Sequence, residues 1–271
     1  MMRGLHTPVR AIRRRVFKEV AQLGFKADED TLLADMEAIP YAIVNEDSEK
    51  YRESVYRARA IVRERLRLAM GLSLRPENKP VHLTAGVEAS NISEKYYEPP
   101  LMQVIPSACE SCEENKYEVS NICKGCLAHP CQEVCPKDAI SMVNGRSYID
   151  QEKCIKCGKC KSVCPYDAIA KKERPCQKAC GVNAIKSDKM GRAYIDNEKC
   201  VSCGMCMVSC PFGAISDKSQ IFQLARALSE GENVIAEIAP AFVGQFGDNI
   251  TPRNIKAALR ELGFSEVYEV A

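Results

Sequence analysis

The sequence predicts an α+β chain in three parts, and three observations lead to this prediction. All sixteen cysteines of the 271 residues lie between Cys109 and Cys210. The residues before them show apolar positions at helical spacing, and the residues after them alternate between helix-like and strand-like segments. We therefore expect a helical N-terminal region with a linker (residues 1–100), a duplicated cysteine-rich domain (101–216) and an incomplete α/β segment (217–271).

The composition describes a chain that can bury real cores. Hydrophobic residues make up 46% and charged residues 27%, and 38 basic residues against 36 acidic ones leave a net charge of +2. This balance argues against nucleic acid as a partner. No apolar run is long enough to span a bilayer, and the N-terminus lacks the apolar core of a secretion signal. We expect a cytoplasmic protein with no membrane partner, although the basic N-terminus leaves an organelle transit peptide as an alternative.

Helices are expected in the N-terminal region because its apolar residues recur at spacings of three and four. The predicted helices run from about Pro8 to Leu23, from Thr31 to Ile39 and from Ser48 to Met70. Gly71 stands where the third helix would stop. Residues 75–100 are polar, aperiodic and proline-containing, so they are expected to form a linker.

The C-terminal segment reads as helix, strand, helix and strand. The four stretches are "KSQIFQLARALSEG", "NVIAEIAP", "TPRNIKAALRELG" and "SEVYEV". A parallel pair of strands needs cover on both faces and further strands beside it, so we expect the chain to be cut off at Ala271. The alternative is that this tail packs on the cysteine-rich domain as a small cap.

Four ten-residue segments of the cysteine-rich part align without gaps. They are "CQEVCPKDAI" from Cys131, "CKSVCPYDAI" from Cys160, "CQKACGVNAI" from Cys176 and "CMVSCPFGAI" from Cys206. A longer match joins residues 144–169 to residues 190–215. Repetition this close indicates duplication. We name residues 123–169 the first module and residues 176–215 the second module.

Each module contains the run C-x2-C-x2-C-x3-C-P. It consists of Cys154, Cys157, Cys160 and Cys164 in the first module, and of Cys200, Cys203, Cys206 and Cys210 in the second. Three closely spaced thiolates suit three irons of one [4Fe–4S] cube, and the fourth ligates the neighbouring cube. Zinc is the alternative, but zinc ribbons use paired C-x2-C knuckles instead. The spacing therefore predicts iron–sulfur clusters.

These motifs resemble the bacterial two-cluster ferredoxin family. By that resemblance, one cluster of the first module is held by Cys123, Cys126, Cys131 and Cys164, and the other by Cys154, Cys157, Cys160 and Cys135. The first group departs from the family pattern because four residues, "LAHP", separate Cys126 from Cys131. His129 lies in this insert, and we expect a loop residue there rather than a ligand, since four cysteines are already present.

The second module lacks one C-x2-C pair. Cys200, Cys203 and Cys206 find their fourth partner in Cys180, which occupies the matching place, but Cys176 and Cys210 are then two thiolates short. Ala168 and Lys171 stand where the lost pair should be, and neither can ligate iron. We assign the upstream pair to this site, giving the set Cys109, Cys112, Cys176 and Cys210, and four [4Fe–4S] clusters in all. The alternative is that the upstream pair binds zinc or nothing and that the chain holds three clusters.

The tail "NVIAEIAPAFVGQFGDNITPRNIKAALRELGFSEVYEV" resembles the start of the catalytic domain of iron-only ([FeFe]) hydrogenases. Together with "TPVRAIRRRVFKEVA" and "CKGCLAHPCQEVCPKDAI", it resembles the monomeric group B branch of that family. The resemblance implies an electron-relay portion that connects a redox protein such as ferredoxin to a catalytic hydrogenase domain or subunit.

Enzymatic activity of these residues is uncertain from the sequence. No cysteine follows Cys210 to hold a hydrogen-activating cluster, and none of the three histidines stands in a nucleophile or general-base pattern. The alternatives are a ferredoxin-like subunit of another anaerobic oxidoreductase and a redox sensor or scaffold.

Overall fold

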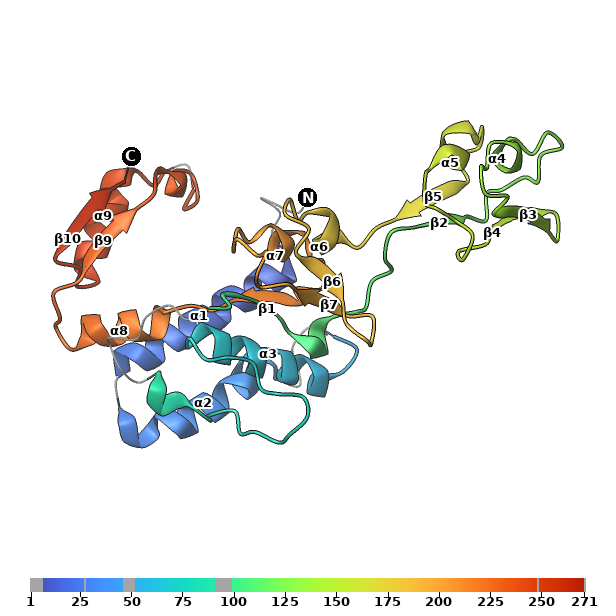
Figure 1. The fold of residues 1–271 in the computed structure, drawn as a ribbon. Coiled ribbons are helices and arrows are strands. Elements are labelled where there is room, and N and C mark those ends of the chain that lie inside the picture. The colour runs from blue at the N-terminus through green and yellow to red at the C-terminus, as the bar shows by residue number, and fades with distance from the viewer. Residues whose placement is uncertain (1–6, 27, 46–51, 91–98, 248, 271) are drawn as a thin grey trace. The chain divides into compact units, whose positions relative to one another are not determined.

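The computed structural model describes residues 7–26, 28–45, 52–90, 99–247 and 249–270 (Figure 1). Three longer helices come first, and small two-stranded sheets with shorter helices follow, which agrees with the α+β class. The chain divides into two compact units. The cysteine-rich unit is Cys109–Pro211, and the flanking unit combines the segments that end at Ala108 and begin at Phe212. Our three-part division at residues 100 and 216 remains a prediction.

The flanking unit is built mainly from helices. They are α1 (Pro8–Lys26), α2 (Glu29–Ile43), α3 (Val55–Ala69) and α8 (Ile221–Ser229), with a short 3-10 turn η1 (Val87–Ala89). The first two expected helices are confirmed and extend further than predicted. The third helix was predicted to include residues 52–54, and this is wrong. Ser54 caps the helix, and its side chain accepts the N–H of Arg57. The earlier part of that prediction, residues 48–51, lies outside the described residues.

The core of the flanking unit joins segments from both ends of its sequence. Val20 of α1, Met36 of α2, Val62 of α3 and Phe222 of α8 belong to one buried cluster. Helices α1 and α8 pack so closely that a Cβ atom on Gly24 would come 2.6 Å from the Cβ of Ala225. Helix α8 is therefore an integral part of the helical core.

Strand pairing brings the same two segments together. Strand β1 (Met102–Val104) pairs antiparallel with β8 (Ile215–Asp217), and a 3-10 turn η2 (Pro106–Ala108) follows β1. Arg52 then bonds both segments at once, since its Nη2 donates to the carbonyl oxygens of Ala108 at 3.2 Å and Phe212 at 2.7 Å. The points where the chain leaves and re-enters this unit are thus held side by side.

The C-terminal segment forms the predicted strand–helix–strand arrangement. Strand β9 (Ile235–Ile238) pairs in parallel with β10 (Glu266–Glu269), and η3 (Pro240–Phe242) and α9 (Pro252–Glu261) lie between them in sequence. Thr251 and Asn254 form a capping box at the start of α9, and Pro252 occupies its first turn. These signals explain why the helix begins where the sequence predicts.

The cysteine-rich unit consists of hairpins and very short helices. Its strand pairs are β2 (Lys116–Val119) with β5 (Ile169–Lys172), β3 (Ile140–Val143) with β4 (Arg146–Ile149), and β6 (Ile185–Ser187) with β7 (Ala193–Ile195). Its helices are α4 (Pro130–Glu133), α5 (Lys159–Val163), α6 (Pro175–Lys178) and α7 (Met205–Ser209). None of the sixteen cysteines forms a disulfide. They take the place of a large apolar core, as shown in the first module, where Cys131 and Cys160 pack with Ile140, Ile149 and Ile169.

Candidate metal centres

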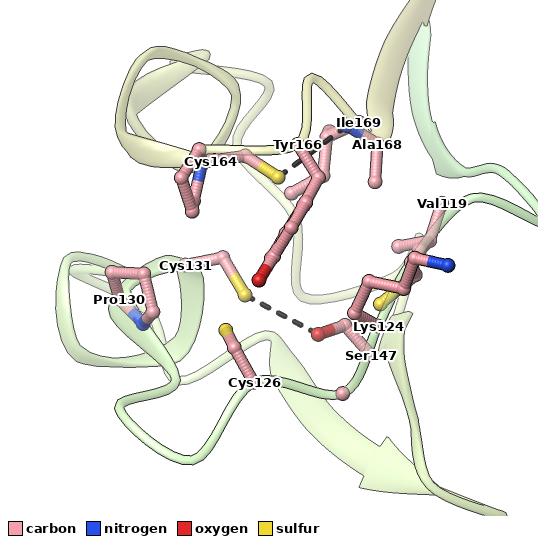
Figure 2. Close-up of a pocket in the computed structure, with 13 residues that line it drawn as sticks. Val119, Lys124, Cys126, Pro130, Cys131, Ser147, Cys164, Tyr166, Ala168 and Ile169 are labelled. Carbon is pink, nitrogen blue, oxygen red and sulfur yellow. Dashed lines mark hydrogen bonds between the residues drawn. The ribbon is translucent and has the colours of Figure 1, made fainter.

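One pocket of the first module is lined by four of the predicted ligands. They are Cys123, Cys126, Cys131 and Cys164. Figure 2 shows the sulfurs of Cys126, Cys131 and Cys164 around this pocket, with the Tyr166 side chain between them. Cys164 reaches it although its sequence neighbours Cys154, Cys157 and Cys160 do not line it. This placement agrees with the crossed arrangement that the sequence predicts.

A second pocket of the first module collects the other four cysteines. They are Cys135, Cys154, Cys157 and Cys160. Apolar side chains, including Ile140, Ile149 and Ile155, complete its wall. The sulfur-lined hollow is thus largely sheltered by hydrocarbon, except near the exposed residue Cys157.

The third set gathers around a buried thiol. Burial raises the pKa of Cys206 to about 11, and the charges of Cys200, Cys203 and Cys180 act in the same direction. The charges of these cysteines act on Cys206 because their sulfurs lie near it. The structure therefore brings together the four cysteines that the sequence assigns to one cluster of the second module.

The fourth set includes the upstream pair. Burial raises the pKa of Cys176 to about 12, with further contributions from Cys210 and Cys109. Burial also raises the pKa of Cys112, again with Cys210 and Cys109 acting in the same direction. The loop that carries Cys109 and Cys112 therefore lies against the incomplete half of the second module.

The first C-x2-C pair of each of the four sets, which we call its knuckle, has the same backbone turn. The residue before the second cysteine has a positive φ in each, namely Ser111 (46°), Gly125 (57°), Lys156 (58°) and Ser202 (54°). Residues other than glycine rarely adopt this left-handed conformation. The upstream pair thus has the local geometry of the three knuckles that belong to the modules.

A second shared turn follows the last cysteine of each aligned segment. The third residue after it has a positive φ in every case: Asp138 (48°), Asp167 (47°), Asn183 (52°) and Gly213 (59°). Asp, Asn and Gly are the residues that tolerate this conformation best. The next residue, alanine, then donates its N–H to the cysteine sulfur in three of the segments, at 3.3 Å from Ala139 to Cys135, 3.4 Å from Ala168 to Cys164 and 3.2 Å from Ala184 to Cys180. Such donors stabilise a thiolate.

The knuckle that begins at Cys123 belongs to the first module, and the knuckle that begins at Cys109 precedes both modules, yet the two contact equivalent hairpins. The backbone N–H of Ser147, in hairpin β3–β4, is the first cause of the lowered pKa of Cys123. Ala193 is the aligned residue in hairpin β6–β7, and its N–H donates to the sulfur of Cys109 at 3.4 Å. Cys109 therefore takes the same place on the second hairpin that Cys123 takes on the first.

Two polar side chains near the thiols had no sequence signal that we recognised. The Ser147 hydroxyl lies 3.3 Å from the sulfur of Cys131. Arg174 is 2% exposed and donates to the Cys112 carbonyl through Nε at 3.0 Å and Nη2 at 2.7 Å. The alignment could have marked both, because Ala193 stands opposite Ser147 and His129 stands opposite Arg174.

The residues that replace the lost pair do not face a thiol set as ligands. Lys171 forms an ion pair with Glu173, and Ala168 contributes only its backbone N–H to Cys164. His129 lies half-buried at the start of α4 with a φ of 43°. Within the described residues, no three His, Cys, Asp or Glu side chains are placed to hold a single metal ion. The four thiolates of a cube each bind a different iron, so they need not converge on a single point.

Three family models match separate parts of the chain. The LdpA Fe-S cluster-binding domain matches residues 123–174, and the 4Fe-4S binding domain matches residues 193–216. The C-terminal domain of the iron only hydrogenase large subunit matches residues 232–271. Among the helices that the structure describes, none combines the length and apolar character needed to cross a membrane.

Curated relatives match the cysteine-rich part. An uncharacterized ferredoxin of Methanocaldococcus jannaschii is 33% identical over 99 residues, which covers 30% of this chain and 63% of the ferredoxin. The electron transport protein HydN of Escherichia coli is 37% identical over 71 residues, covering 26% of this chain and 41% of HydN. The protein named Ferredoxin 7Fe, from Hydrogenibacillus schlegelii, is 43% identical over 53 residues, covering 20% of this chain and 68% of that ferredoxin. The chain thus spans less than two thirds of the first two relatives, and the matches agree on iron–sulfur binding and electron transport.

Proposed function

Because the cysteine-rich part of this chain belongs to the ferredoxin family, we propose that its four cysteine sets hold four [4Fe–4S] clusters and form an electron relay. Bound clusters of this type accept and donate single electrons. The ligands we propose are the sets described above, one for each cluster. The close match between the two modules supports an origin by duplication.

One observation carries this proposal, namely that all four sets have the same construction. Each combines a C-x2-C knuckle with a left-handed turn, one cysteine from a short helix, and one cysteine that precedes a second left-handed turn. In the fourth set these parts are the pair Cys109 and Cys112, Cys176 of α6, and Cys210. A pair that bound zinc or nothing would have no reason to reproduce the knuckle geometry and the contact with a hairpin N–H.

The chain's own residues adapt the sites to electron transfer. The helix cysteines Cys131, Cys160, Cys176 and Cys206 are buried, which limits water near the sulfurs. Backbone N–H groups point at several sulfurs and favour the more negative, reduced form of a cluster. Cys157 and Cys203 are exposed. We propose that electrons enter or leave near these two residues.

We further propose that the relay serves the hydrogen-activating site of an iron-only hydrogenase of the monomeric group B type. The match of residues 232–271 to a hydrogenase domain supports this, and so does the parallel β9–β10 pair with α9. The external partner would be a redox protein such as ferredoxin, and the location would be the cytoplasm. The similarity to HydN favours a second candidate, an electron-transfer subunit of another anaerobic oxidoreductase.

Iron and sulfide analysis of the anaerobically reconstituted chain tests the number of clusters. We expect about sixteen irons and sixteen sulfides per chain. The double variant Cys109→Ser/Cys112→Ser should hold about twelve of each. Ser111→Ala, in the same loop, is the control and should keep the full content. A wild-type value near twelve that does not change in the double variant would exclude the fourth site.

A further inference from the structure

Arg174 is a buried cation whose hydrogen bonds are all made within the cysteine-rich unit. It precedes α6 and is 2% exposed. Its five N–H groups all find acceptors: two reach the Cys112 carbonyl, and the others reach the carbonyls of Lys186 and Gly191 and the hydroxyl of Ser187. One side chain thus ties the upstream knuckle to the hairpin β6–β7.

None of these four acceptors carries a charge. Among the ion pairs of the described residues, none involves Arg174, and the nearest carboxylate in its network, Glu114, is exposed and contacts Ser187 instead. A buried charge without a counter-charge is costly. The charge of Arg174 acts on the thiols of Cys112 and Cys176, two members of the fourth set. Burial raises the pKa of both Cys112 and Cys176, and the charge of Arg174 acts in the opposite direction.

The first module has no such cation. The residue aligned with Arg174 is His129, which is half-buried, precedes α4 with a φ of 43° and makes no side-chain cap. Ser147 is the polar group that approaches the thiols of the equivalent site there. The charge that acts on the first-module thiols belongs to Arg146, which is exposed, so the two sites differ in that only the fourth site has a buried cation beside it.

We propose that Arg174 is a positioning residue that fixes the upstream knuckle and raises the reduction potential of the fourth site, so that electrons rest there rather than at its counterpart in the first module. This inference rests on the proposed function, because it requires a cluster at the fourth site. Reduction adds one negative charge to a cluster, and a nearby fixed positive charge in a poorly hydrated region stabilises the reduced state more than the oxidised one.

Redox titration of the reconstituted full chain, followed by electron paramagnetic resonance, tests this inference. The signal that disappears in Cys109→Ser/Cys112→Ser identifies the fourth site. In Arg174→Gln, the affinity of that site for an electron should fall by about tenfold, which is about 59 mV for a one-electron couple. Arg174→Lys keeps the charge and should stay near the wild-type potential. His129→Gln is the matched control and should leave the fourth-site signal in place.

Each other outcome gives a clear answer. Arg174→Gln with four clusters and an unchanged fourth potential would overturn the electrostatic role. If Arg174→Gln loses the fourth cluster, Arg174→Lys decides, because loss there as well would show that the charge alone does not sustain the site. A failure of the proposed function would appear differently, as a wild-type chain with about twelve irons and no signal that depends on Cys109.

Discussion

The two modules contain the same elements in the same order, yet they complete their thiol sets differently. The first module supplies both knuckles from its own sequence, whereas the incomplete half of the second is approached by a loop that begins at Cys109, before either module. Despite this, Cys109 and Cys123 receive N–H groups from aligned positions of equivalent hairpins. A knuckle is therefore defined by its own turn and by its place on a hairpin, and less by its position in the sequence.

The modules also differ in the groups around equivalent thiols. Ser147 brings a hydroxyl to Cys131, while its counterpart Ala193 has none. Arg174 brings a buried charge to the second module, while His129 occupies the aligned position in the first. The repeated thiol geometry is thus combined with unequal surroundings.

The largest expected effect comes from removing the cysteine that crosses between sites. Cys164→Ser should cost one cluster, about four irons, and should make Cys123, Cys126 and Cys131 reactive toward an alkylating reagent. The reason is that Cys164 lines their pocket rather than that of Cys154, Cys157 and Cys160. Mass spectrometry of the alkylated protein locates the reactive thiols.

The equivalent change in the second module tests the fourth set. Cys210→Ser should make Cys109, Cys112 and Cys176 reactive, because these lie near Cys210. Alkylation of Cys154, Cys157 and Cys160 in Cys164→Ser would instead contradict the crossed arrangement.

A smaller effect should follow from adding a side chain to a knuckle. In Gly125→Ala, the new Cβ would lie 2.1 Å from the carbonyl oxygen of Gly145, at a φ of 57°, so the knuckle or the hairpin turn must move. We expect a cost of about 2 kcal/mol or more, seen as faster loss of iron from the first module to a chelator. Ser111→Ala is the matched control, because Ser111 already carries a Cβ at a φ of 46°. Equal rates of iron loss in both variants would show that the turn is not constrained.

The smallest expected effect concerns the hydroxyl that distinguishes the two hairpins. Ser147→Ala should lower the potential of the site that contains Cys131, because it removes a hydroxyl that lies 3.3 Å from that sulfur and can donate to a thiolate. A hydrogen bond contributes about 1 kcal/mol net, so the affinity for an electron should change by about tenfold or less. Ala193→Ser should have the opposite sign in the second module if the added hydroxyl reaches a thiolate. Redox titration of both variants measures the reduction potentials. An unchanged potential in Ser147→Ala would show that the hydroxyl does not influence the site.

Much of the fold and of the thiol sets follows from local sequence. The resemblance to two-cluster ferredoxins and the one unassigned C-x2-C pair predicted four cysteine sets, and their assignment as cluster ligands stays a prediction. Helix α9 begins at its predicted proline. The Asp, Asp, Asn and Gly that precede Ala139, Ala168, Ala184 and Ala214 carried a further signal for left-handed turns that we did not use.

Long-range features were beyond prediction from the sequence. The alignment distinguishes Arg174 from His129, but the burial of Arg174 depends on a loop and a hairpin that are distant in sequence, so it could not be predicted. The same holds for α8, whose Phe222 fills a core made by helices near the N-terminus. The start of α3 was predicted too early because the capping role of Ser54 was not used as a signal for the helix start.

The closure of the flanking unit by Arg52 has a consequence for the order of events during synthesis. Its helices α1, α2 and α3 leave the ribosome first, but β1 finds its partner β8, and α1 finds α8, only after the intervening residues 109–211 have been made. Contacts between such distant segments form slowly, because a long loop must first be closed. All sixteen cysteines are therefore translated before the flanking unit can finish folding. Iron and sulfide can be delivered to a chain whose helical part has not yet completed its contacts.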